Sequence, residues 1–470
     1  MAIELSSVTF TEQDDIVPPS GVEQIFNTGI ANTLAGNDII TGNGGNRFGA
    51  GIRNQLGIIN TSNGNDIITG IYNQKENFFF GYGIDNRQAT IDTGDGDDII
   101  SGTAISSGYG INNDTTTIDT GDGNDTITGI TQARGGAGIS SYRTTIETGK
   151  GNDIFTGTGL TGISFMFATT LTTGDGNDIV TGTSTGDIVT SGTGIATSAF
   201  IDTGGGDDII TGTTAYGYGI INSQGAITTG DGNDIITGRG DSLRSGFLNS
   251  GIINTGNDTD SIISHGNFFN TNFYGQVLLG DGNDSLIVHT DFSRNAIDNL
   301  NTIEMGDGND LIASTGVIYN EGIINTSNGE DLIIVYGGSD GTGSPYGGPD
   351  GTGTVSGIYN NGGTINTGDG NDSIIANQGF RSGLNNSGSL FLGNGEDYLQ
   401  GFGSGDFYGG NGNDILELTP GTYTVGIWDT SAVFTKGNQL MITSEFEKLR
   451  AGSTIYDFTS LTAGQIIIVA

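Results

Sequence analysis

Apolar and polar residues alternate in short blocks along most of the chain, and the blocks return at regular intervals. The phrase TGDGNDIITG stands at 229–238, and close variants stand at 61–70, 93–102, 120–129, 173–182 and 367–376. After the last Asp of each phrase comes a short segment rich in β-branched residues, such as Ile-Ile-Thr at 235–237, which is typical of a β-strand. The blocks are too short and too rich in β-branched residues and Gly to predict helices.

The last Asp of the phrase marks fifteen copies with an average spacing of about 27 residues, far above chance for one motif. Between copies lie a Gly-x-Gly-Ile phrase, such as GYGIDN at 81–86, and a second apolar phrase, such as ATIDTG at 89–94. Each period therefore predicts three short strands separated by Gly-rich corners. The marking residues are Asp38, Asp66, Asp98, Asp125, Asp153, Asp178, Asp208, Asp234, Asp260, Asp284, Asp310, Asp331, Asp372, Asp397 and Asp414.

A unit of this size cannot bury its own apolar face, whereas stacked copies share one continuous core. We therefore predict an all-β fold, a parallel β-solenoid (β-roll or β-helix) of fifteen turns, one for each copy. The residue two places after each marking Asp should form a buried ladder, because it is large and apolar in every copy. These residues are Ile40, Ile68, Ile100, Ile127, Phe155, Val180, Ile210, Ile236, Ile262, Leu286, Ile312, Ile333, Ile374, Leu399 and Leu416.

The ends of the chain differ from the middle. We expect an N-terminal cap at 1–32, the repeats at 33–419 with a loop insertion at 337–353, and a β-rich C-terminal cap at 420–470. The N-terminus lacks the basic stretch and apolar core of a cleaved signal peptide, and no apolar run is long enough to span a bilayer.

Composition narrows the class of protein. The chain has 53 acidic and 14 basic residues, for a net charge of −39, and it has no cysteines. This charge argues against binding nucleic acid or anionic membranes, and the lack of Cys excludes disulfide scaffolds and thiolate metal sites. A hydrophobic content of 33% is too high for a disordered acidic chain, so cations must neutralise the acids before the chain compacts. The 41 Asp against 12 Glu favour ligation of a hard cation.

The copy at 93–101 resembles the calcium-binding nonapeptide of RTX (hemolysin-type) proteins, G-G-x-G-x-D-x-U-x. Thr93 takes the first Gly position, Asp95 the third, Asp98 the sixth and Ile100 the large apolar position. The resemblance covers about 33–418 and implies Ca²⁺ between loops of neighbouring turns, about one ion in each gap. Elementary chemistry agrees, because Ca²⁺ takes six to eight oxygen ligands and a column of carboxylates about 5 Å apart repels itself without a cation.

The predicted metal ligands are the sixth-position Asp residues together with those at the third position of the phrase. They are Asp66, Asp95, Asp98, Asp122, Asp125, Asp153, Asp175, Asp178, Asp208, Asp231, Asp234, Asp281, Asp284, Asp307, Asp310, Asp331, Asp369, Asp372, Asp397 and Asp414. Three copies depart from the phrase, through Leu34-Ala35, Lys150 and Asp258, and predict weaker sites. The alternative is a solvated corner at which Asn and Gly only shape the turns.

The residues one and three places after the marking Asp should face outward and form an Ile row and a Thr row in the first eight copies. Such a face predicts an interface, and hence a homo-oligomer, filament or layer. Two alternatives remain: binding of ice by a regular Thr/aliphatic array, and mere β-propensity on a face that loops cover. The rows are Ile39, Ile67, Ile99, Thr126, Ile154, Ile179, Ile209 and Ile235, and Thr41, Thr69, Ser101, Thr128, Thr156, Thr181, Thr211 and Thr237.

The repeats predict an extracellular calcium-binding protein of structural or adhesive function, which folds after secretion. The resemblance to RTX proteins implies type I secretion from an uncleaved C-terminal segment. Calcium, further copies of the chain and a cell-surface polysaccharide are the expected partners. The scattered arginines form no catalytic constellation, so we expect no enzyme, no catalytic residues and no organic cofactor. A carbohydrate-active enzyme on the solenoid and a monomeric calcium buffer are the remaining alternatives.

Overall fold

The computed structural model describes residues 2–18, 23–45, 49–73, 81–105, 108–132, 135–241, 245–270, 274–290, 295–336, 357–381 and 388–470. Their regular structure is β-strand, apart from two single-turn 3-10 segments, η1 (Leu5–Ser7) and η2 (Phe458–Ser460). None of the described segments contains a helix long and apolar enough to cross a membrane. The predicted loop insertion at 337–353 lies outside the described residues.

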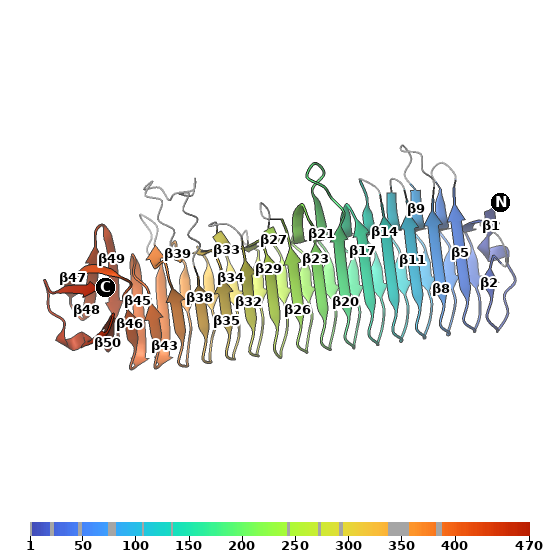
Figure 1. Ribbon diagram of the computed structural model, residues 1–470. Helices are drawn as coiled ribbons and strands as arrows, with labels where there is room; N and C mark the ends of the chain where they lie inside the picture. The colour runs from blue at the N-terminus through green and yellow to red at the C-terminus, as the bar shows by residue number, and fades with distance from the viewer. Residues whose placement is uncertain are drawn as a thin grey trace. The chain divides into compact units, whose positions relative to one another are not determined.

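The chain forms two compact units, Met1–Thr255 and Gly256–Ala470. In each unit, one turn of the chain, here called a coil, contributes a strand to each of three sheets, A, B and C. Equivalent strands of successive coils are parallel neighbours in register, as β11 (Ile99–Ala104) and β14 (Thr126–Thr131) show (Figure 1). This arrangement confirms the predicted parallel β-solenoid.

The first unit contains a complete set of three sheets. Sheet A has β1 (Ala2–Glu4), β3 (Gln24–Asn27), β6 (Ala50–Gln55), β9 (Gly81–Arg87), β12 (Gly108–Asp114), β15 (Ala137–Tyr142), β18 (Thr161–Met166), β21 (Gly192–Thr197), β24 (Gly217–Asn222) and β27 (Ser245–Asn249). Sheet B has β2 (Ile16–Val17), β5 (Ile39–Gly44), β8 (Ile67–Tyr72), β11, β14, β17 (Ile154–Gly159), β20 (Ile179–Ser184), β23 (Ile209–Thr213) and β26 (Ile235–Arg239). Sheet C has β4 (Ile30–Asn32), β7 (Ile58–Asn60), β10 (Thr90–Asp92), β13 (Thr117–Asp119), β16 (Thr145–Glu147), β19 (Thr170–Thr172), β22 (Phe200–Asp202), β25 (Ala226–Thr228) and β28 (Ile252–Asn254).

The second unit repeats the three sheets and adds antiparallel strands. Sheet A has β30 (Asn267–Asn270), β33 (Asn295–Asn299), β36 (Val317–Asn320), β39 (Ile358–Asn360) and β42 (Phe380–Arg381). Sheet B has β29 (Ser261–His265), β32 (Ser285–His289), β35 (Leu311–Ser314), β38 (Leu332–Val335), β41 (Ser373–Ala376), β44 (Tyr398–Gln400) and β46 (Ile415–Glu417). Sheet C has β31 (Gln276–Leu278), β34 (Thr302–Glu304), β37 (Ile323–Asn325), β40 (Thr364–Asn366), β43 (Ser389–Gly395) and β45 (Gly405–Gly412). The terminal strands are β47 (Gly421–Trp428), β48 (Ser431–Lys436), β49 (Gln439–Ser444), β50 (Lys448–Ala451), β51 (Thr454–Asp457) and β52 (Ile466–Val469), and their mutual pairings are antiparallel.

The core is a set of apolar ladders, one on the inner side of each sheet. All fifteen residues predicted for the sheet B ladder are buried, which confirms that ladder. In sheet A, Ile84, Ile111 and Ile139 stack in register. Fully burying an aliphatic side chain contributes about 1.5–3 kcal/mol. Three such side chains cannot offset the conformational entropy that a coil of about 27 residues loses when it folds, so a single coil cannot fold by itself.

Two corners of the coil carry polar ladders of different chemistry. At the end of many sheet A strands, Asn side chains stack: Asn27 Nδ2 donates to Asn54 Oδ1 at 2.9 Å, and Asn54 Nδ2 to Asn86 Oδ1 at 3.0 Å. An amide both donates and accepts, so a member inside a run, such as Asn54, satisfies both of its polar groups, whereas Asn86 Nδ2 at the end of this run makes no hydrogen bond. The corner between sheet C and sheet B carries the marking Asp residues instead, and this corner is the candidate site.

Candidate calcium-binding column

The loop from sheet C to sheet B is shaped by two glycines. In the loop at 93–98, Gly94 and Gly96 have φ of 79° and 144°, in the region that other residues rarely adopt. A Cβ atom on Gly96 would lie 1.9 Å from the carbonyl oxygen of Gly64 in the preceding coil. The glycines therefore let successive loops stack closely with their carbonyl groups along the coil axis.

The fifteen marking Asp residues, here called the Asp column, are all buried, with exposed fractions of 2% or less. Within each unit, the backbone N–H of each column Asp donates to Oδ1 of the following one. The distances are 2.7 Å from Asp66 to Asp98, 2.8 Å from Asp98 to Asp125 and 2.8 Å from Asp284 to Asp310. We expected successive carboxylates to face one another across an ion, but a backbone N–H stands between them. Oδ1 is thereby satisfied, which leaves Oδ2 as the oxygen available to a cation.

Oδ2 is the unusual atom of the column. In most members it is buried and accepts no hydrogen bond, and leaving a buried polar atom unpaired costs about 1–3 kcal/mol, more for a charged group. Asp38 and Asp153 differ, because Thr33 and Thr148 donate to their Oδ2 atoms. The members with unpaired Oδ2 include Asp66, Asp98, Asp125, Asp178, Asp208, Asp284, Asp310, Asp331, Asp372, Asp397 and Asp414.

Burial raises the pKa of the column carboxyl groups, although the neighbouring Thr hydroxyl and the backbone N–H lower it in part where they are present. The pKa of Asp98 rises to about 8. It rises to about 7 for Asp125, Asp208, Asp310, Asp372 and Asp397, and to about 6 for Asp66, Asp153, Asp284 and Asp414. Ionised near neutral pH, these groups need a positive partner at Oδ2.

Neutral oxygens surround Oδ2 in the same loop. The residue five places before the column Asp is a buried Thr in most copies. The hydroxyls of Thr93, Thr120 and Thr203 make no hydrogen bond of ordinary geometry, but they lie close enough to the Asp of the same loop to lower its pKa. Elsewhere the hydroxyl reaches the next coil, as in the 3.1 Å hydrogen bond from Thr173 Oγ1 to the Thr203 carbonyl oxygen. A carboxylate oxygen, a hydroxyl and main-chain carbonyls form a set of hard ligands that suits Ca²⁺.

No group of three or more acidic, His or Cys side chains in the described segments is arranged to hold a metal ion. A cation in this loop would therefore be held by single carboxylates together with neutral oxygens. Because Ca²⁺ readily accepts backbone and hydroxyl oxygens, such a donor set still fits it.

The third-position Asp residues form a separate row, here called the outer Asp row. They are exposed, whereas the column Asp of the same loop is buried, so the predicted ligands fall into two groups on opposite sides of the backbone. Lys150, which replaces one of them, is largely exposed and pairs with Asp175 at 3.4 Å. The row comprises Asp95, Asp122, Asp175, Asp231, Asp281, Asp307 and Asp369.

The structure adds residues that the sequence pattern missed. Asp15 extends the column, since its backbone N–H donates to Asp38 Oδ1 at 2.7 Å, and Glu447 extends the other end by accepting from the Asp414 N–H at 2.8 Å. The signal for Asp15 was the sequence DDIV at 14–17, which matches DDII at 97–100. The Thr at the first position of the phrase, such as Thr93, buries its side chain in the same loop, and the sequence pattern did not indicate a role for that side chain.

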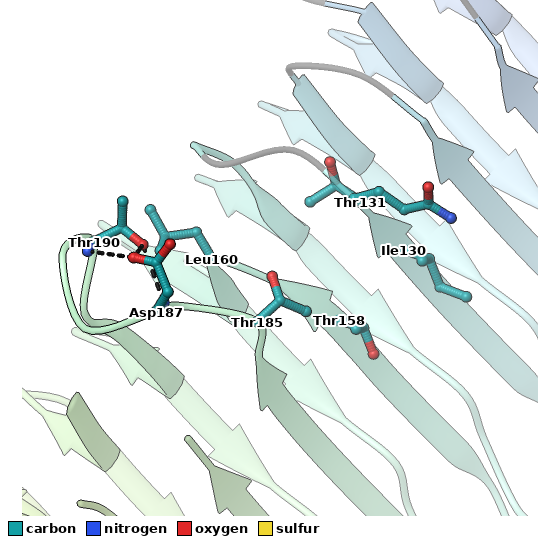
Figure 2. Close-up of a pocket in the computed structure, with 8 residues that line it drawn as sticks. Ile130, Thr131, Thr158, Leu160, Thr185, Asp187 and Thr190 are labelled. Carbon is teal, nitrogen blue, oxygen red and sulfur yellow. Dashed lines mark hydrogen bonds between the residues drawn. The ribbon is translucent and has the colours of Figure 1, made fainter. Parts of the chain in front are cut away.

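A surface pocket of about 440 Å³ lies beside the ends of β14 and β17 (Figure 2). Ile130, Leu160 and Thr158 line it, and the loop containing Asp187 and Thr190 borders it. Asp187 Oδ1 accepts hydrogen bonds from the backbone N–H and Oγ1 of Thr190, both at 2.9 Å. These contacts order the loop itself, so the Asp column remains the better candidate for the functional site.

Comparison with known proteins gives little beyond the fold. No family model and no curated protein matches the chain. Among solved structures, the chain is similar to a hyperactive, Ca²⁺-dependent, β-helical antifreeze protein from an Antarctic bacterium. The sequences are 17% identical, the TM-score is 0.33, and the similarity covers 97% of this chain and 98% of the other. Identity and score this low assign no function.

Proposed function

We propose that Ca²⁺ ions bind inside the loops of the Asp column and hold the coils together. Each ion would take Oδ2 of a column Asp, the Oγ1 of the Thr five places earlier where that Thr is present, and loop carbonyl oxygens. This placement is on the inner side of the loop, away from the outer Asp row. Because an ion that binds only the folded chain stabilises it, calcium would control folding.

The buried, unpaired Oδ2 atoms carry this proposal. The Asn ladder provides an internal comparison, because that corner needs the same contact between coils and uses neutral amides, of which a member inside a run, such as Asn54, satisfies both of its polar groups. If the Asp corner were only a turn support, Asn would serve it better than an acid with one unpaired oxygen. The recurrence of Asp in fifteen copies is therefore explained by a cation.

Circular dichroism of the full chain in millimolar calcium and in excess chelator tests the proposal. We expect the β signal and the cooperative melting transition in calcium, and a large loss of both in chelator. Magnesium at the same concentration should restore little, because Mg²⁺ demands a strict octahedron and keeps its waters. Unchanged β content in chelator would refute calcium-dependent folding.

We further propose an extracellular, structural or adhesive role in a protein related to RTX proteins. In calcium-poor cytosol the column carboxylates would repel one another and keep the chain expanded, whereas millimolar calcium outside the cell would fold it. The proposal includes no catalysis. Turnover of an acidic polysaccharide by the purified chain would contradict this part.

The outer face of sheet B is proposed as the surface for self-association. Within the first unit its Ile and Thr rows are aligned from strand to strand, as in Ile99–Thr126–Ile154 and Ser101–Thr128–Thr156. Neither row contains an acidic residue, although the chain carries a net charge of −39. A second copy of the same face would cover the exposed aliphatic side chains without bringing carboxylates together.

Mass measurement in calcium tests this surface. Replacing Ile99, Ile154 and Ile209 by Lys should give monomers if the wild type forms larger particles. The matched control places three Lys on the outer side of sheet C, at Thr117, Thr145 and Thr170, and should assemble as the wild type does. Equal particle masses for the wild type and the Ile→Lys variant would contradict the interface.

The aligned Thr row also supports a second candidate function, the binding of ice. A flat array with the spacing of adjacent strands, about 4.8 Å, offers hydroxyl and methyl groups in a regular lattice. Thermal hysteresis of the monomeric protein in calcium, lost on replacing Thr128, Thr156 and Thr181 by Lys, would favour this candidate over self-association. No hysteresis at any concentration would exclude it.

A further inference from the structure

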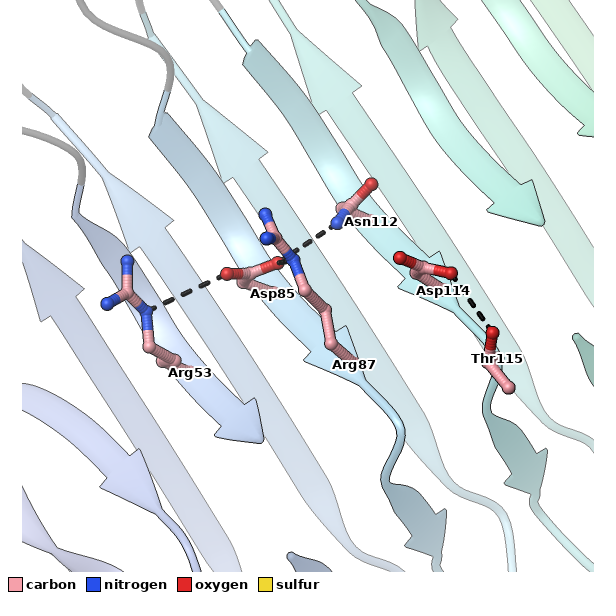
Figure 3. Close-up of polar contacts among 6 residues, drawn as sticks. All are labelled: Arg53, Asp85, Arg87, Asn112, Asp114 and Thr115. Carbon is pink, nitrogen blue, oxygen red and sulfur yellow. Dashed lines mark hydrogen bonds and ion pairs between the residues drawn. The ribbon is translucent and has the colours of Figure 1, made fainter. Parts of the chain in front are cut away.

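A cluster of Arg, Tyr, Asp and Asn side chains lies on sheet A in the first unit, and Figure 3 shows its Arg, Asp and Asn members. Arg53, Asp85 and Asn112 are register neighbours on β6, β9 and β12. Tyr82 and Tyr109 are neighbours at the other end of β9 and β12. Together with Arg87, these six residues are here called the Arg–Tyr strip. They lie on a different sheet from the Ile and Thr rows.

Asp85 organises the strip. It is 1% exposed, and its Oδ1 accepts from Arg87 Nε at 2.7 Å and from Asn112 Nδ2 at 3.0 Å. Arg53 Nε lies 3.7 Å from its Oδ2. The side chains of Arg53 and Arg87 are 27% and 38% exposed, and they flank the buried carboxylate (Figure 3). A buried acid therefore fixes two partly exposed cations by their Nε edges, and a guanidinium has four further N–H donors.

The strip is also distinct in charge. Asp114 stands beside Arg87 in the register, and its Oδ1 accepts from Thr115 Oγ1 at 3.1 Å. Counting Asp114 with Asp85, two carboxylates face two guanidinium groups. The strip thus carries no net negative charge in a chain of −39, so an anion meets less repulsion here than over the acidic loops.

Aromatic rings extend the strip along the coil axis. Tyr82 and Tyr109 stack with ring centroids 5.9 Å apart and planes at 24°, and both are partly exposed. The Arg87 guanidinium lies 5.2 Å from the Tyr82 ring centroid. Beyond Asn112 the same register line continues with Ser140 and Ser164, so hydroxyl groups follow the amide along the face.

We propose that the Arg–Tyr strip binds a uronic acid unit of an acidic polysaccharide that runs across the strands. Arg87 and Arg53 hold the carboxylate, because a guanidinium fork matches the geometry of that group. The rings of Tyr82 and Tyr109 pack against the apolar face of the sugar ring, and Asn112 bonds to sugar hydroxyls. Asp85 is a positioning residue that holds the two guanidinium groups. An acidic peptide is the less favoured ligand, because the register line beyond Asn112 continues with Ser140 and Ser164, which carry hydroxyl groups and no apolar side chain.

The test uses the full chain in calcium and a galacturonic acid trimer as the probe, with binding measured by calorimetry at fixed free calcium. A neutral galactose trimer tests the role of charge, and tricarballylate and an acidic peptide test whether a carboxylate suffices without the sugar. We expect the galacturonate trimer to bind at least about tenfold more tightly than each of the other three.

The main variant is the triple substitution Arg53→Gln, Asp85→Asn and Arg87→Gln, which removes the buried charges together and so avoids an unpaired carboxylate. It should weaken binding of the trimer at least about tenfold, and Arg87→Lys should weaken it less. The matched control, Arg239→Gln with Arg381→Gln, removes two cations elsewhere and should leave affinity unchanged. Circular dichroism and the calcium midpoint must match the wild type in all variants.

The Tyr109→Ala variant tests the contribution of the sugar ring separately from that of its carboxylate. It should weaken the galacturonate trimer several-fold and leave tricarballylate unaffected. No binding of the trimer up to millimolar concentration, equal losses in the triple variant and the control, or equally tight binding of the acidic peptide would each overturn the proposal. None of these outcomes depends on ions in the Asp column, so the failure of either proposal can be recognised separately.

Discussion

Replacing Asp125 by Asn removes one charge from the Asp column and keeps its hydrogen bond. Asn Oδ1 can still accept from the Asp98 N–H, which lies 2.8 Å from Asp125 Oδ1. The only chemical change is at Oδ2, where an amide N–H₂ replaces the oxygen that accepts no hydrogen bond. The substitution should therefore have opposite effects in the absence and the presence of calcium.

Without calcium, burial raises the pKa of Asp125 from 3.8 to about 7. Above that pH, keeping the folded group ionised costs about 4 kcal/mol. Asn removes this cost, and its N–H₂ can donate to Thr120 Oγ1, although a second donor without a partner offsets about 1–3 kcal/mol. We expect a local stabilisation of about 1–3 kcal/mol in chelator. With calcium at about one hundred times its dissociation constant, losing one site should instead destabilise the coil by about 2.7 kcal/mol.

Hydrogen–deuterium exchange of peptides covering β13 and β14 measures the effect, because stability in a solenoid is local to each coil and its neighbours. Relative to the wild type, protection of these peptides should fall in calcium, and the residual protection that remains in chelator should rise. Asp122→Asn, in the outer Asp row of the same loop, is the matched control and should show no reversal of sign.

A second control makes the reciprocal change in the Asn ladder. Asn54→Asp removes the donor to Asn86 Oδ1 and buries a charge, so it should destabilise its coil in both conditions, without rescue by calcium. If Asp125→Asn is neutral or stabilising in calcium as well as in chelator, the column is a turn support and binds no ion. If Asp122→Asn reverses sign like Asp125→Asn, the outer row also holds ligands.

Three further predictions follow from the same column. In chelator, stability should fall as pH rises through about 6 to 8, because the folded-state pKa values of Asp66, Asp125 and Asp98 are raised to about 6, 7 and 8 and the folded chain binds more protons than the unfolded one. A melting temperature of the calcium-free chain that increases from about pH 5 to pH 8 would contradict this sign. Thr120→Val should weaken calcium binding in its loop several-fold at nearly unchanged volume, which calcium titration of local exchange would reveal, whereas Thr117→Val on the outer side of sheet C should not. Leu279, Met305 and Leu392 replace the Thr in the loops of Asp284, Asp310 and Asp397, so those loops should bind Ca²⁺ only at higher calcium concentrations. Leu279→Thr should lower the calcium midpoint of its loop. If these loops bind Ca²⁺ at the same concentration as the loops of the first unit, the hydroxyl is not a ligand.

The repeat was sufficient to predict the fold and most of the column. A period of about 27 residues with a large apolar residue two places after each Asp leaves stacking as the physical way to bury that residue, and the ladder from Ile40 to Leu416 is buried as expected. The same repeat located the column Asp residues, since one register applies to every copy. Asp15 and Glu447 were missed because the coils at the ends keep the position of the acid but not the surrounding phrase.

Only the tertiary structure shows which side of the loop each carboxylate faces. The sequence places Asp95 and Asp98 three residues apart in one loop, and the pattern predicts both as ligands without distinguishing them. Only the backbone path through Gly94 and Gly96 exposes the first and buries the second. Likewise, the Arg–Tyr strip joins Arg53, Asp85 and Asn112, which are about thirty residues apart and show no shared motif.

By itself, therefore, the sequence determined the solenoid, its period, its apolar ladders and the line of acids along one corner. These features recur in every copy, so each copy independently supports the same prediction. The tertiary structure decided which oxygen of each acid is left for a cation and which isolated residues meet on the face of sheet A. Both depend on contacts between neighbouring coils, where the backbone N–H of one Asp takes Oδ1 of the next and leaves Oδ2 buried. Such contacts arise from stacking, and the order of residues along one coil does not contain them.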